Sequence, residues 1–415
     1  MGFSTLSEIV DGGYCLSCGL CADLVPEGVI DMAFTPDENL RPRATRPLTA
    51  DENARIARLC PGVSMDAKLT DEDDPVWGRI LATWEGWASD PDTRFRASAG
   101  GVMTAINHYL LASGRADFIL QARAAGPDAL TSEPVMIRDP DELLSGSQSR
   151  YAPSAPLSMI EKALATGEKF AVSLKPCDIA GVRNLQAADK RARDQIVFTQ
   201  AMFCGTVPSR ETTWKMLTRK GHDPAKVAPT AFRWRGDGCP GTAKATYADG
   251  REVMATYNEM WTDARWTTQF RCKICPDAIG LQTDIATGDF WPGAVPTGDT
   301  PGENGIIAHT ETGLEIARAA EAAGYLTLHD TDLATIADTQ PHHVRLRQTF
   351  ATRVRAATAS GLPDPDFRGL AAKAAADQLP QTDHDTTYAG TLARLKVDTS
   401  DCVSEFDDWT PEEAP

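Results

Sequence analysis

The sequence lacks long apolar runs, since no stretch of its 415 residues approaches the roughly 20 apolar residues that a membrane-spanning helix needs. Its start, MGFSTLSEIVDGGYC, also lacks the basic region and apolar stretch of a secretory signal. Basic charge is in deficit, because 41 Lys and Arg oppose 58 Asp and Glu and leave a formal net charge of −17. We therefore expect a cytoplasmic protein with no membrane span, and neither nucleic acid nor anionic lipid as a partner.

Cysteine, by contrast, is plentiful. A reduced compartment disfavours a disulfide framework, so the ten cysteines and their clustering indicate metal binding. Apolar residues make up 42% of the chain, enough for a sizeable core. Composition and pattern along the chain predict four parts, which are a cysteine-bearing N-terminal segment (1–70), the two halves of a mixed body (80–165 and 166–340), and a basic helix with a loose acidic tail (341–415).

The body is expected to be of the α+β class, a mixed α/β body carrying a small ferredoxin-like N-terminal segment. Apolar periodicity predicts helices over 102–114, 161–165, 178–185, 311–323 and 341–358. Strands are predicted over 117–120, 170–174, 196–203, 232–235, 243–247, 253–257, 284–288 and 305–309, with Asp249-Gly250 as a hairpin turn. The acidic stretch 71–75 is predicted to be a linker, and the tail from about 376 to be loosely held.

The strongest chemical signal is Cys15-Leu-Ser-Cys18-Gly-Leu-Cys21. Three thiols at this spacing wrap the backbone around one face of a cubane cluster in bacterial ferredoxins, where a more distant Cys-Pro supplies the fourth ligand. Cys60 precedes Pro61 and is the natural fourth ligand of a [4Fe–4S] cluster. The alternative is a structural zinc ion, which usually takes two well-separated cysteine pairs.

Four further cysteines can form a second group. Cys272 and Cys275 make a second C-x-x-C, while Cys177 and Cys204 each follow a predicted strand. Ligand sites in α/β folds favour the carboxyl ends of strands, so these thiols can meet. Spacing alone leaves open whether they do or whether Cys177 and Cys204 are buried core residues. The two remaining cysteines, Cys239 and Cys402, are interpreted as structural.

A glycine turn at Arg96-Ala-Ser98-Ala-Gly100-Gly101-Val-Met-Thr104 precedes the helix expected from 102. Glycines at a helix N-terminus expose backbone N–H groups that can hold a phosphate. From the sequence alone, a helix cap by Ser98 is the favoured interpretation.

Five stretches, in this order, resemble the coenzyme F420 hydrogenase/dehydrogenase beta-subunit family, and they are Ser98–Ala105, Lys175–Arg183, Phe203–Ser209, Arg271–Asp277 and Asp284–Asp289. The resemblance spans about residues 10–350 and extends to ferredoxin-dependent reductases of chlorophyll biosynthesis. It implies FAD and two [4Fe–4S] clusters, the second on Cys177, Cys204, Cys272 and Cys275. It also implies that the cofactor-binding residues are Arg96, Ser98, Gly100, Gly101, Thr104, Lys175 and Asp178.

The expected function is an oxidoreductase that passes electrons from a ferredoxin or similar donor through the clusters to FAD and on to a small organic substrate. The alternative is a non-catalytic electron-transfer beta subunit of a larger complex, and a homo-oligomer stays open. Arg345, Arg347, Arg353 and Arg355 are predicted to form a basic patch that docks an acidic donor. No residue stands out as a proton donor, and His108 and His309 are only candidates.

Overall fold

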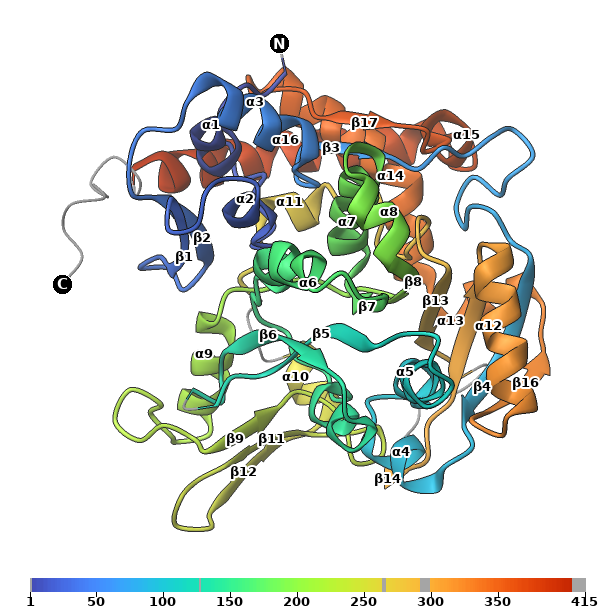
Figure 1. Cartoon of the computed structure of the whole chain (residues 1–415). Coiled ribbons are helices and arrows are strands. Elements are labelled where there is room, and N and C mark those ends of the chain that lie inside the picture. The colour runs from blue at the N-terminus through green and yellow to red at the C-terminus, as the bar shows by residue number, and fades with distance from the viewer. Residues whose placement is uncertain (1, 127, 263–265, 292–298, 405–415) are drawn as a thin grey trace.

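The computed structural model describes residues 2–126, 128–262, 266–291 and 299–404. A mixed sheet of eight strands forms its centre (Figure 1). The strands, in spatial order, are β16 (Leu326–Asp330), β4 (Ala82–Ala88), β15 (Asn304–Ala308), β13 (Ile285–Asp289), β8 (Ile196–Met202), β7 (Phe170–Leu174), β5 (Phe118–Ala124) and β6 (Ser132–Ile137). The four strands β13, β8, β7 and β5 run parallel, and the outer pairings are antiparallel. The expected mixed α/β class is confirmed.

Helices cover both faces of this sheet. Successive side chains of a strand point to opposite faces, so apolar residues on both faces can pack against helices. Phe170 and Val172 of β7 pack into the core on one face, whereas Ala171 between them packs into the core on the other. The first face carries α6 (Ile160–Ala165), α7 (Pro176–Ala188) and α8 (Lys190–Gln195), and the second carries α5 (Val102–Ala112) and α12 (Glu311–Ala322). The helices predicted from apolar periodicity therefore form where the sequence indicated.

The N-terminal segment packs as part of the body. Its elements are α1 (Leu6–Asp11), α2 (Leu20–Asp23), β1 (Ile30–Phe34), β2 (Leu40–Ala44), α3 (Ala50–Leu59) and β3 (Ser64–Asp66). Side chains from α1, α2 and α3 share one hydrophobic core with β5, β7 and α7. The Asn184 Nδ2 on α7 donates to the carbonyls of Leu59 and Ser64 at 3.2 and 2.9 Å. The boundary near residue 70 stays a prediction, but the packing is continuous across it.

The acidic stretch expected as a loose linker forms an ordered turn. The Asp74 Oδ1 accepts hydrogen bonds from the backbone N–H groups of Val76 and Trp77, both at 2.8 Å. Both of those side chains are buried against the far end of the body. The expectation of a loose linker is therefore wrong, because two apolar residues directly after the acidic run anchor it.

A smaller sheet lies below the main one in Figure 1. It consists of β9 (Ala231–Arg233), β11 (Ala243–Thr246) and β12 (Glu252–Ala255), and α9 (Glu211–Arg219) and α10 (Tyr257–Thr262) pack beside it. The predicted hairpin turn is present, with Gly250 at a φ of 82°. Trp234 fills the core of this part.

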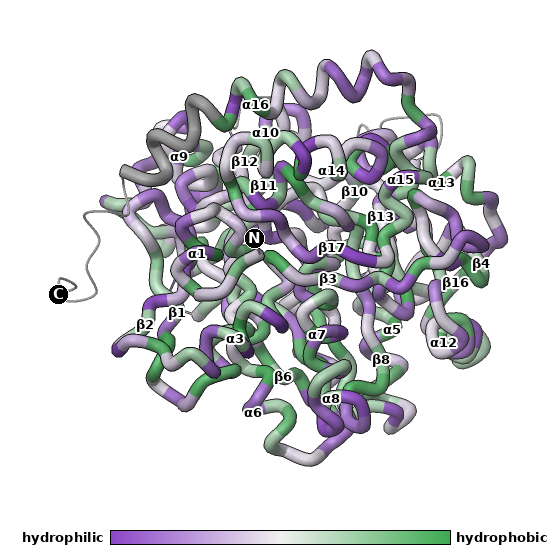
Figure 2. Tube along the Cα trace, turned by 90° about the horizontal axis from the view of Figure 1, so that it is seen from above, coloured by the Kyte–Doolittle hydropathy of each residue, from purple (hydrophilic) through white to green (hydrophobic). Residues whose placement is uncertain are grey.

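The C-terminal region differs from its prediction. α13 (Leu333–Thr339), α14 (Pro341–Ala359), β17 (Asp366–Arg368), α15 (Ala372–Ala376) and α16 (Gln381–Ser404) follow one another. β17 pairs in parallel with β3 of the N-terminal segment, and α16 packs along α14 at the outside of the molecule (Figure 2). The buried His384 of α16 bonds to Thr352 of α14 at 2.7 Å. The tail is therefore held as far as α16, while residues 405–415 and the Cys402 side chain lie outside what the structure describes.

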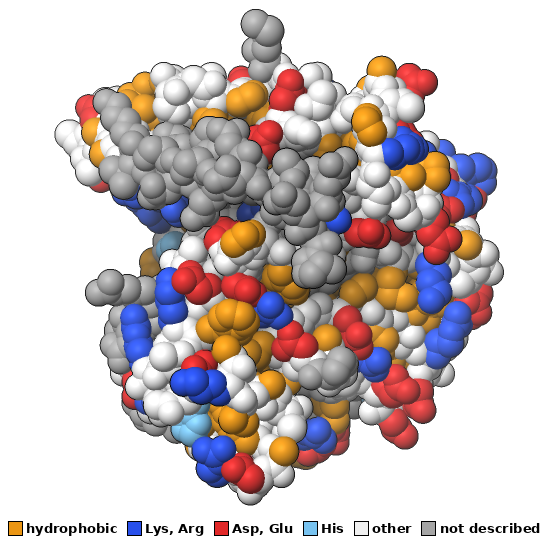
Figure 3. Space-filling view, turned by 90° about the vertical axis from the view of Figure 1, so that its left-hand side faces the viewer, with side chains coloured by type: hydrophobic (Ala, Val, Ile, Leu, Met, Phe, Trp, Pro, Cys, Tyr) orange, Lys and Arg blue, Asp and Glu red, His pale blue; other side chains and the backbone are white. Residues whose placement is uncertain are grey.

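The predicted basic patch does not form one exposed face. The Arg347 guanidinium is 1% exposed and donates to the carbonyls of Pro75, Val76, Pro276 and Leu370. Arg353 donates to the Lys273 carbonyl at 2.9 Å, and Arg345 pairs with Asp383 at 3.4 Å. On the face in Figure 3, basic and acidic side chains are interspersed. Within the described residues, no helix is both long and apolar enough to cross a bilayer.

Candidate cofactor sites

Cys15 and Cys18 lie in a tight loop between α1 and α2, and Cys21 follows in the first turn of α2. Left-handed backbone conformations at Ser17 (φ 59°) and Gly19 (φ 81°) reverse the chain between them. The Ser17 N–H donates to the Cys15 Sγ at 3.4 Å, so the loop wraps around its own thiols. Cys60 joins them from the end of α3, where its N–H closes the last turn on the Ile56 carbonyl at 2.8 Å.

These four thiols are close enough to influence one another's ionisation. Burial raises the pKa of Cys18 well above its usual value, and the thiol of Cys60 adds to that shift. Burial and then Cys15 raise the pKa of Cys60 to about 12. Their common pocket is otherwise aliphatic, lined among others by Leu6, Ile9, Leu20, Leu24 and Ile56. The sequence-predicted quartet Cys15, Cys18, Cys21 and Cys60 is therefore brought together in three dimensions.

The second group converges at the carboxyl edge of the parallel strands. Cys177 lies in the first turn of α7, directly after β7, and Cys204 follows β8. The Cys204 N–H donates to the Ala278 carbonyl at 2.8 Å, which fixes the β8 end against the loop after α11 (Phe270–Lys273). That loop carries Cys275, whose N–H donates to the Cys272 carbonyl at 3.3 Å.

Electrostatic coupling links all four thiols of this group. Burial raises the pKa of Cys177, and Cys204 and Cys272 are among the neighbours that raise it further. Burial likewise raises the pKa of Cys204, followed by the effects of Cys272 and Cys275. The mutual influence of these thiols agrees with convergence of the second group, and their role as ligands of a cluster stays a prediction.

Neither quartet is arranged around a single ion. In the described part of the chain, no three His, Cys, Asp or Glu side chains come together tightly enough to hold one metal ion. A structural zinc site needs four ligands at about 2.0–2.3 Å from one centre. Each quartet consists of buried and half-buried cysteines, and four thiols that do not meet at one centre suit a multi-atom iron–sulfur cluster better than a single zinc ion.

A pocket of about 660 Å³ opens beside the second quartet, within the usual size range for cofactor sites. It lies where β7, β8 and β13 end, so it occupies the carboxyl edge of the parallel strands, as ligand sites in α/β folds do. Its walls come from the N-terminal ends of α5, α7 and α14, from the loop 146–154, and from Tyr257 and Trp261 of α10. Cys204 belongs both to this lining and to the second quartet.

The glycine turn supplies one wall of the pocket. Ser98, Gly101 and Thr104 line it, and Gly101 is the N-cap of α5 with a φ of 77°. The Ser98 cap weighed from the sequence is wrong, because the Ser98 hydroxyl donates to the Ser147 carbonyl and it is the Asn304 Oδ1 that accepts from the Val102 N–H at 3.4 Å. Gly100 faces the sheet instead, because a Cβ there would come within 2.9 Å of the Gly86 carbonyl oxygen.

Arg96 does not reach this pocket. Its guanidinium is half-exposed and lies 3.3 Å from Asp92 on the same helix, α4 (Pro91–Arg96). Lys175 and Asp178, the other two expected cofactor residues, line the pocket as a buried pair, with the Lys175 Nζ 2.6 Å from the Asp178 Oδ2. Burial raises the pKa of Asp178, and the Lys175 ammonium opposes that shift. The Asp178 Oδ1 has no hydrogen-bond partner.

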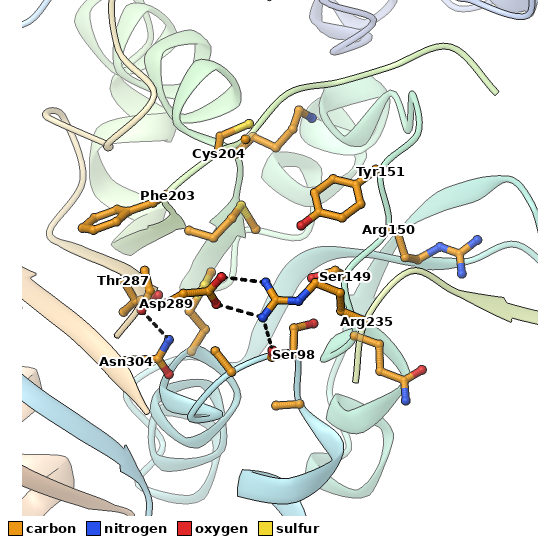
Figure 4. A pocket seen from close by; sticks show the side chains of 18 of the residues that line it. Ser98, Ser149, Arg150, Tyr151, Phe203, Cys204, Arg235, Thr287, Asp289 and Asn304 are labelled. Atoms are coloured by element: carbon orange, nitrogen blue, oxygen red, sulfur yellow. Dashed lines mark hydrogen bonds and ion pairs between the residues drawn. The ribbon is translucent and has the colours of Figure 1, made fainter. Parts of the chain in front are cut away.

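The floor of the pocket holds an ion pair that the sequence did not single out. Figure 4 shows Arg235 facing Asp289 and reaching the glycine turn. The Arg235 Nη1 lies 2.7 Å from the Asp289 Oδ2, and its Nη2 donates to the Ser98 carbonyl at 2.9 Å. Although burial disfavours the charged form, Asp289 holds the pKa of Arg235 above its usual value. Asp289 closes the 284–289 stretch that carried the family resemblance, and this was the only available signal for the pair.

Histidines approach the pocket from α14. His342 and His343 line it, and both ring nitrogens of the buried His343 lack hydrogen-bond partners. Burial, and then His342, lower the pKa of His343 to about 4, so its ring is neutral near pH 7. Of the two histidines considered from the sequence, His108 is exposed on α5 and His309 is buried with its Nδ1 2.6 Å from the Arg79 carbonyl oxygen. Neither lines this pocket.

Comparison with known proteins explains this combination. The model of the coenzyme F420 hydrogenase/dehydrogenase beta-subunit N-terminal region matches residues 83–161, and that of the C-terminal region matches residues 167–333. Both matched regions belong to one family of hydrogenase and dehydrogenase beta subunits. The chain belongs to the coenzyme F420 hydrogenase/dehydrogenase beta-subunit family, as its motifs indicated.

Three similar proteins illustrate the family. A coenzyme F420-dependent sulfite reductase of Methanocaldococcus jannaschii is 26% identical over 79% of this chain and 49% of its own length. The beta subunit of F420-dependent formate dehydrogenase 1 of Methanococcus maripaludis is 25% identical, over 58% of this chain and 59% of its own length. This chain therefore spans about half to three fifths of these relatives. A chain of the F420-reducing [NiFe] hydrogenase complex from Methanosarcina barkeri shares the fold, with a TM-score of 0.55, 20% identity, and coverage of 71% of this chain and 98% of that one.

Proposed function

We propose that this chain is an electron-transfer oxidoreductase subunit that binds two [4Fe–4S] clusters and a flavin, FAD, beside the second cluster. The Cys15, Cys18, Cys21 and Cys60 quartet would ligate one cluster, and the Cys177, Cys204, Cys272 and Cys275 quartet the other. When bound, the flavin would exchange electron pairs with a hydride carrier, and the clusters would pass electrons singly. The proposed role is therefore that of a beta subunit in a larger complex, and not that of a reductase that works alone.

One observation carries this proposal: Cys204 belongs both to the second quartet and to the pocket lining. A ring cofactor in the pocket would therefore lie directly against a cluster ligand, with no intervening element. The N-terminal end of α5 presents backbone N–H groups around Gly101, which suit a diphosphate. Lys175, at the N-terminal end of α7, adds a cation to the pocket lining.

The hydride carrier is proposed from the relatives. The sulfite reductase and the formate dehydrogenase are both named as F420-dependent. A deazaflavin of that kind is therefore the first carrier to test. Trp261 and Tyr257 line the mouth side of the pocket and offer aromatic faces for a second ring.

The test is anaerobic purification followed by cofactor analysis and donor mixing. We expect about eight irons and one FAD per chain, which is two cubanes' worth of iron. Reduced F420 should then bleach the cluster absorption, whereas NADPH should not. Zinc with little iron, or about four irons with every cysteine intact, contradicts the two-cluster proposal.

A second candidate is a reductase that takes electrons from ferredoxin, because the N-terminal quartet lies outside both matched stretches and provides a separate entry point. Reduced ferredoxin and reduced F420 distinguish the two. Bleaching by ferredoxin, together with turnover of a small substrate by the single chain, favours this candidate. Bleaching by F420 without any turnover favours the beta-subunit role.

A further inference from the structure

A buried arginine lies between the two cysteine quartets. Arg271 is 0% exposed and immediately precedes Cys272 in the chain. Its Nε donates to the Gly62 carbonyl at 2.7 Å, and its Nη2 donates to the Pro61 carbonyl at 3.2 Å. Pro61 and Gly62 are the two residues that follow Cys60, so one guanidinium joins the backbone of the first quartet to the helix that carries the second.

The contact with the first quartet is close. A Cβ built on Gly62 would come within 3.3 Å of the Cys60 Sγ and would collide with the Tyr14 carbonyl oxygen. Because only glycine fits there, the backbone carbonyl of Gly62 can reach the guanidinium while its α-carbon lies against the thiol. Arg271 is thus fixed on the inner side of the Cys60 turn.

No carboxylate neutralises this cation. Among the described residues, Arg271 forms no ion pair, and its Nη1 has no hydrogen-bond partner. The comparison with Arg235 is direct, since that arginine is also buried but lies 2.7 Å from Asp289. A buried charge without a counter-charge is strongly unfavourable, so an uncompensated arginine at this place implies an anion that the protein side chains do not supply.

Arg271 is close to both quartets, because it bonds to the carbonyls of the two residues that follow Cys60 and directly precedes Cys272. Four thiolates around a [4Fe–4S] core carry net negative charge, and each one-electron reduction adds one more. A fixed cation near such a cluster favours its reduced form, as local charge does for other cluster sites.

We propose that Arg271 is a shared counter-charge for both clusters, a positioning residue that raises the reduction potential of each and holds the two sites in register. This inference rests on the proposed function, because it requires both clusters. One electron enters one cluster and leaves for the other, and Arg271 itself gains or loses neither electron nor proton. Its role is to make both sites accept that electron at similar potentials.

The test is a redox titration of the intact, anaerobically purified protein followed by electron paramagnetic resonance. Arg271→Gln removes the positive charge. Arg271→Lys keeps the charge but loses the planar guanidinium that bonds two carbonyls at once. We expect the potentials of both clusters to fall in Arg271→Gln and to stay near the wild-type values in Arg271→Lys. Arg138→Gln is the control, because it also removes one positive charge, but Arg138 is half-exposed, pairs with Glu168 and does not line the pocket, so it should leave both potentials unchanged.

The outcomes separate this inference from the proposed function. A wild type without two clusters contradicts the proposed function before any variant is compared. With two clusters present, unchanged potentials in Arg271→Gln, or a fall in only one of them, overturn the shared counter-charge. If Arg271→Gln retains no iron, Arg271→Lys decides. Two clusters at wild-type potentials then support the charge role, and lost iron or lowered potentials overturn it.

Discussion

The two cysteine quartets are assembled by opposite routes. Three ligands of the first lie within seven residues, and the fourth follows one helix later. The second draws its ligands from the ends of two parallel strands, from α11 and from the loop after it, over nearly a hundred residues. The first is thus defined by local backbone turns, and the second exists only once the sheet has formed.

Their surroundings differ in the same way. The first quartet is enclosed by aliphatic side chains of its own segment, such as Ile9 and Ile56. The second borders a pocket that has charged side chains in its walls, with Lys175 and Asp178 beside Cys177. The comparison therefore suggests that the first site carries electrons and the second couples them to bound chemistry.

The largest expected effect tests whether the two quartets differ in their link to the flavin. Cys177→Ala should lose about four irons and most of the flavin, because its site shares a wall with the pocket, whereas Cys18→Ala should lose about four irons and keep the flavin. Iron and flavin contents of the two purified variants measure this. Equal flavin loss in both variants would show that the pocket depends on the N-terminal segment as a whole. The continuous packing of that segment with α7 supports this alternative.

Next in size is the ion pair at the pocket floor. Asp289→Asn leaves the Arg235 guanidinium buried with its main partner neutralised, so we expect a loss of about 3–5 kcal/mol in the free energy of unfolding and weaker flavin retention. Chemical denaturation with flavin fluorescence measures both. Glu168→Gln is the control, since it removes a half-exposed surface partner of Arg138 and should cost about 1 kcal/mol or less. Similar losses in the two variants would contradict the special role of the floor pair.

Much of this architecture could be predicted from the sequence. Strand 170–174 and the α5 and α12 helices were correct because their apolar residues repeat at the spacing of a buried strand or a helix face. The first quartet was readable because its ligands are local. The second needed either the family resemblance or the fold, since nothing in the chain spacing brings Cys177 to Cys275.

What the sequence did not supply depends on tertiary contacts. Arg347 belongs to an apparent basic run, yet four backbone carbonyls from distant segments bury it. Arg235 and His343 have no motif around them, and they become pocket residues only when β9, β13 and α14 meet. The tail was predicted to be loosely held because its sequence is polar. Its helix, α16, is held by packing against α14 rather than by an apolar stripe of its own.

A smaller effect tests how tightly the first quartet is packed. Gly62→Ala would push a methyl group against the Tyr14 carbonyl and the Cys60 thiol, so we expect a loss of about 1–3 kcal/mol and reduced occupancy of the first cluster. Gly126→Ala is the matched control, because nothing lies within 4 Å of a Cβ there. Thermal unfolding and iron content compare them. Unchanged iron in Gly62→Ala would mean that the Cys60 turn can shift without cost to the site.

The smallest expected effect concerns electron entry at α14. A docking patch of four arginines would have made charge reversal there strongly damaging, but Arg345 instead forms a half-exposed pair with Asp383 at 3.4 Å. Exposed pairs of this kind contribute about 0–1 kcal/mol, so Arg345→Glu should barely change stability. We also expect Arg345→Glu to slow reduction of the clusters by ferredoxin only slightly. This difference from the wild type should disappear at high salt, because salt screens surface charge. Stopped-flow bleaching of the clusters at low and high salt measures this, with dithionite reduction as the reference that charge reversal leaves unaffected. A large, salt-sensitive fall in the ferredoxin rate alone would restore α14 as the docking surface and place electron entry beside the second quartet rather than the first.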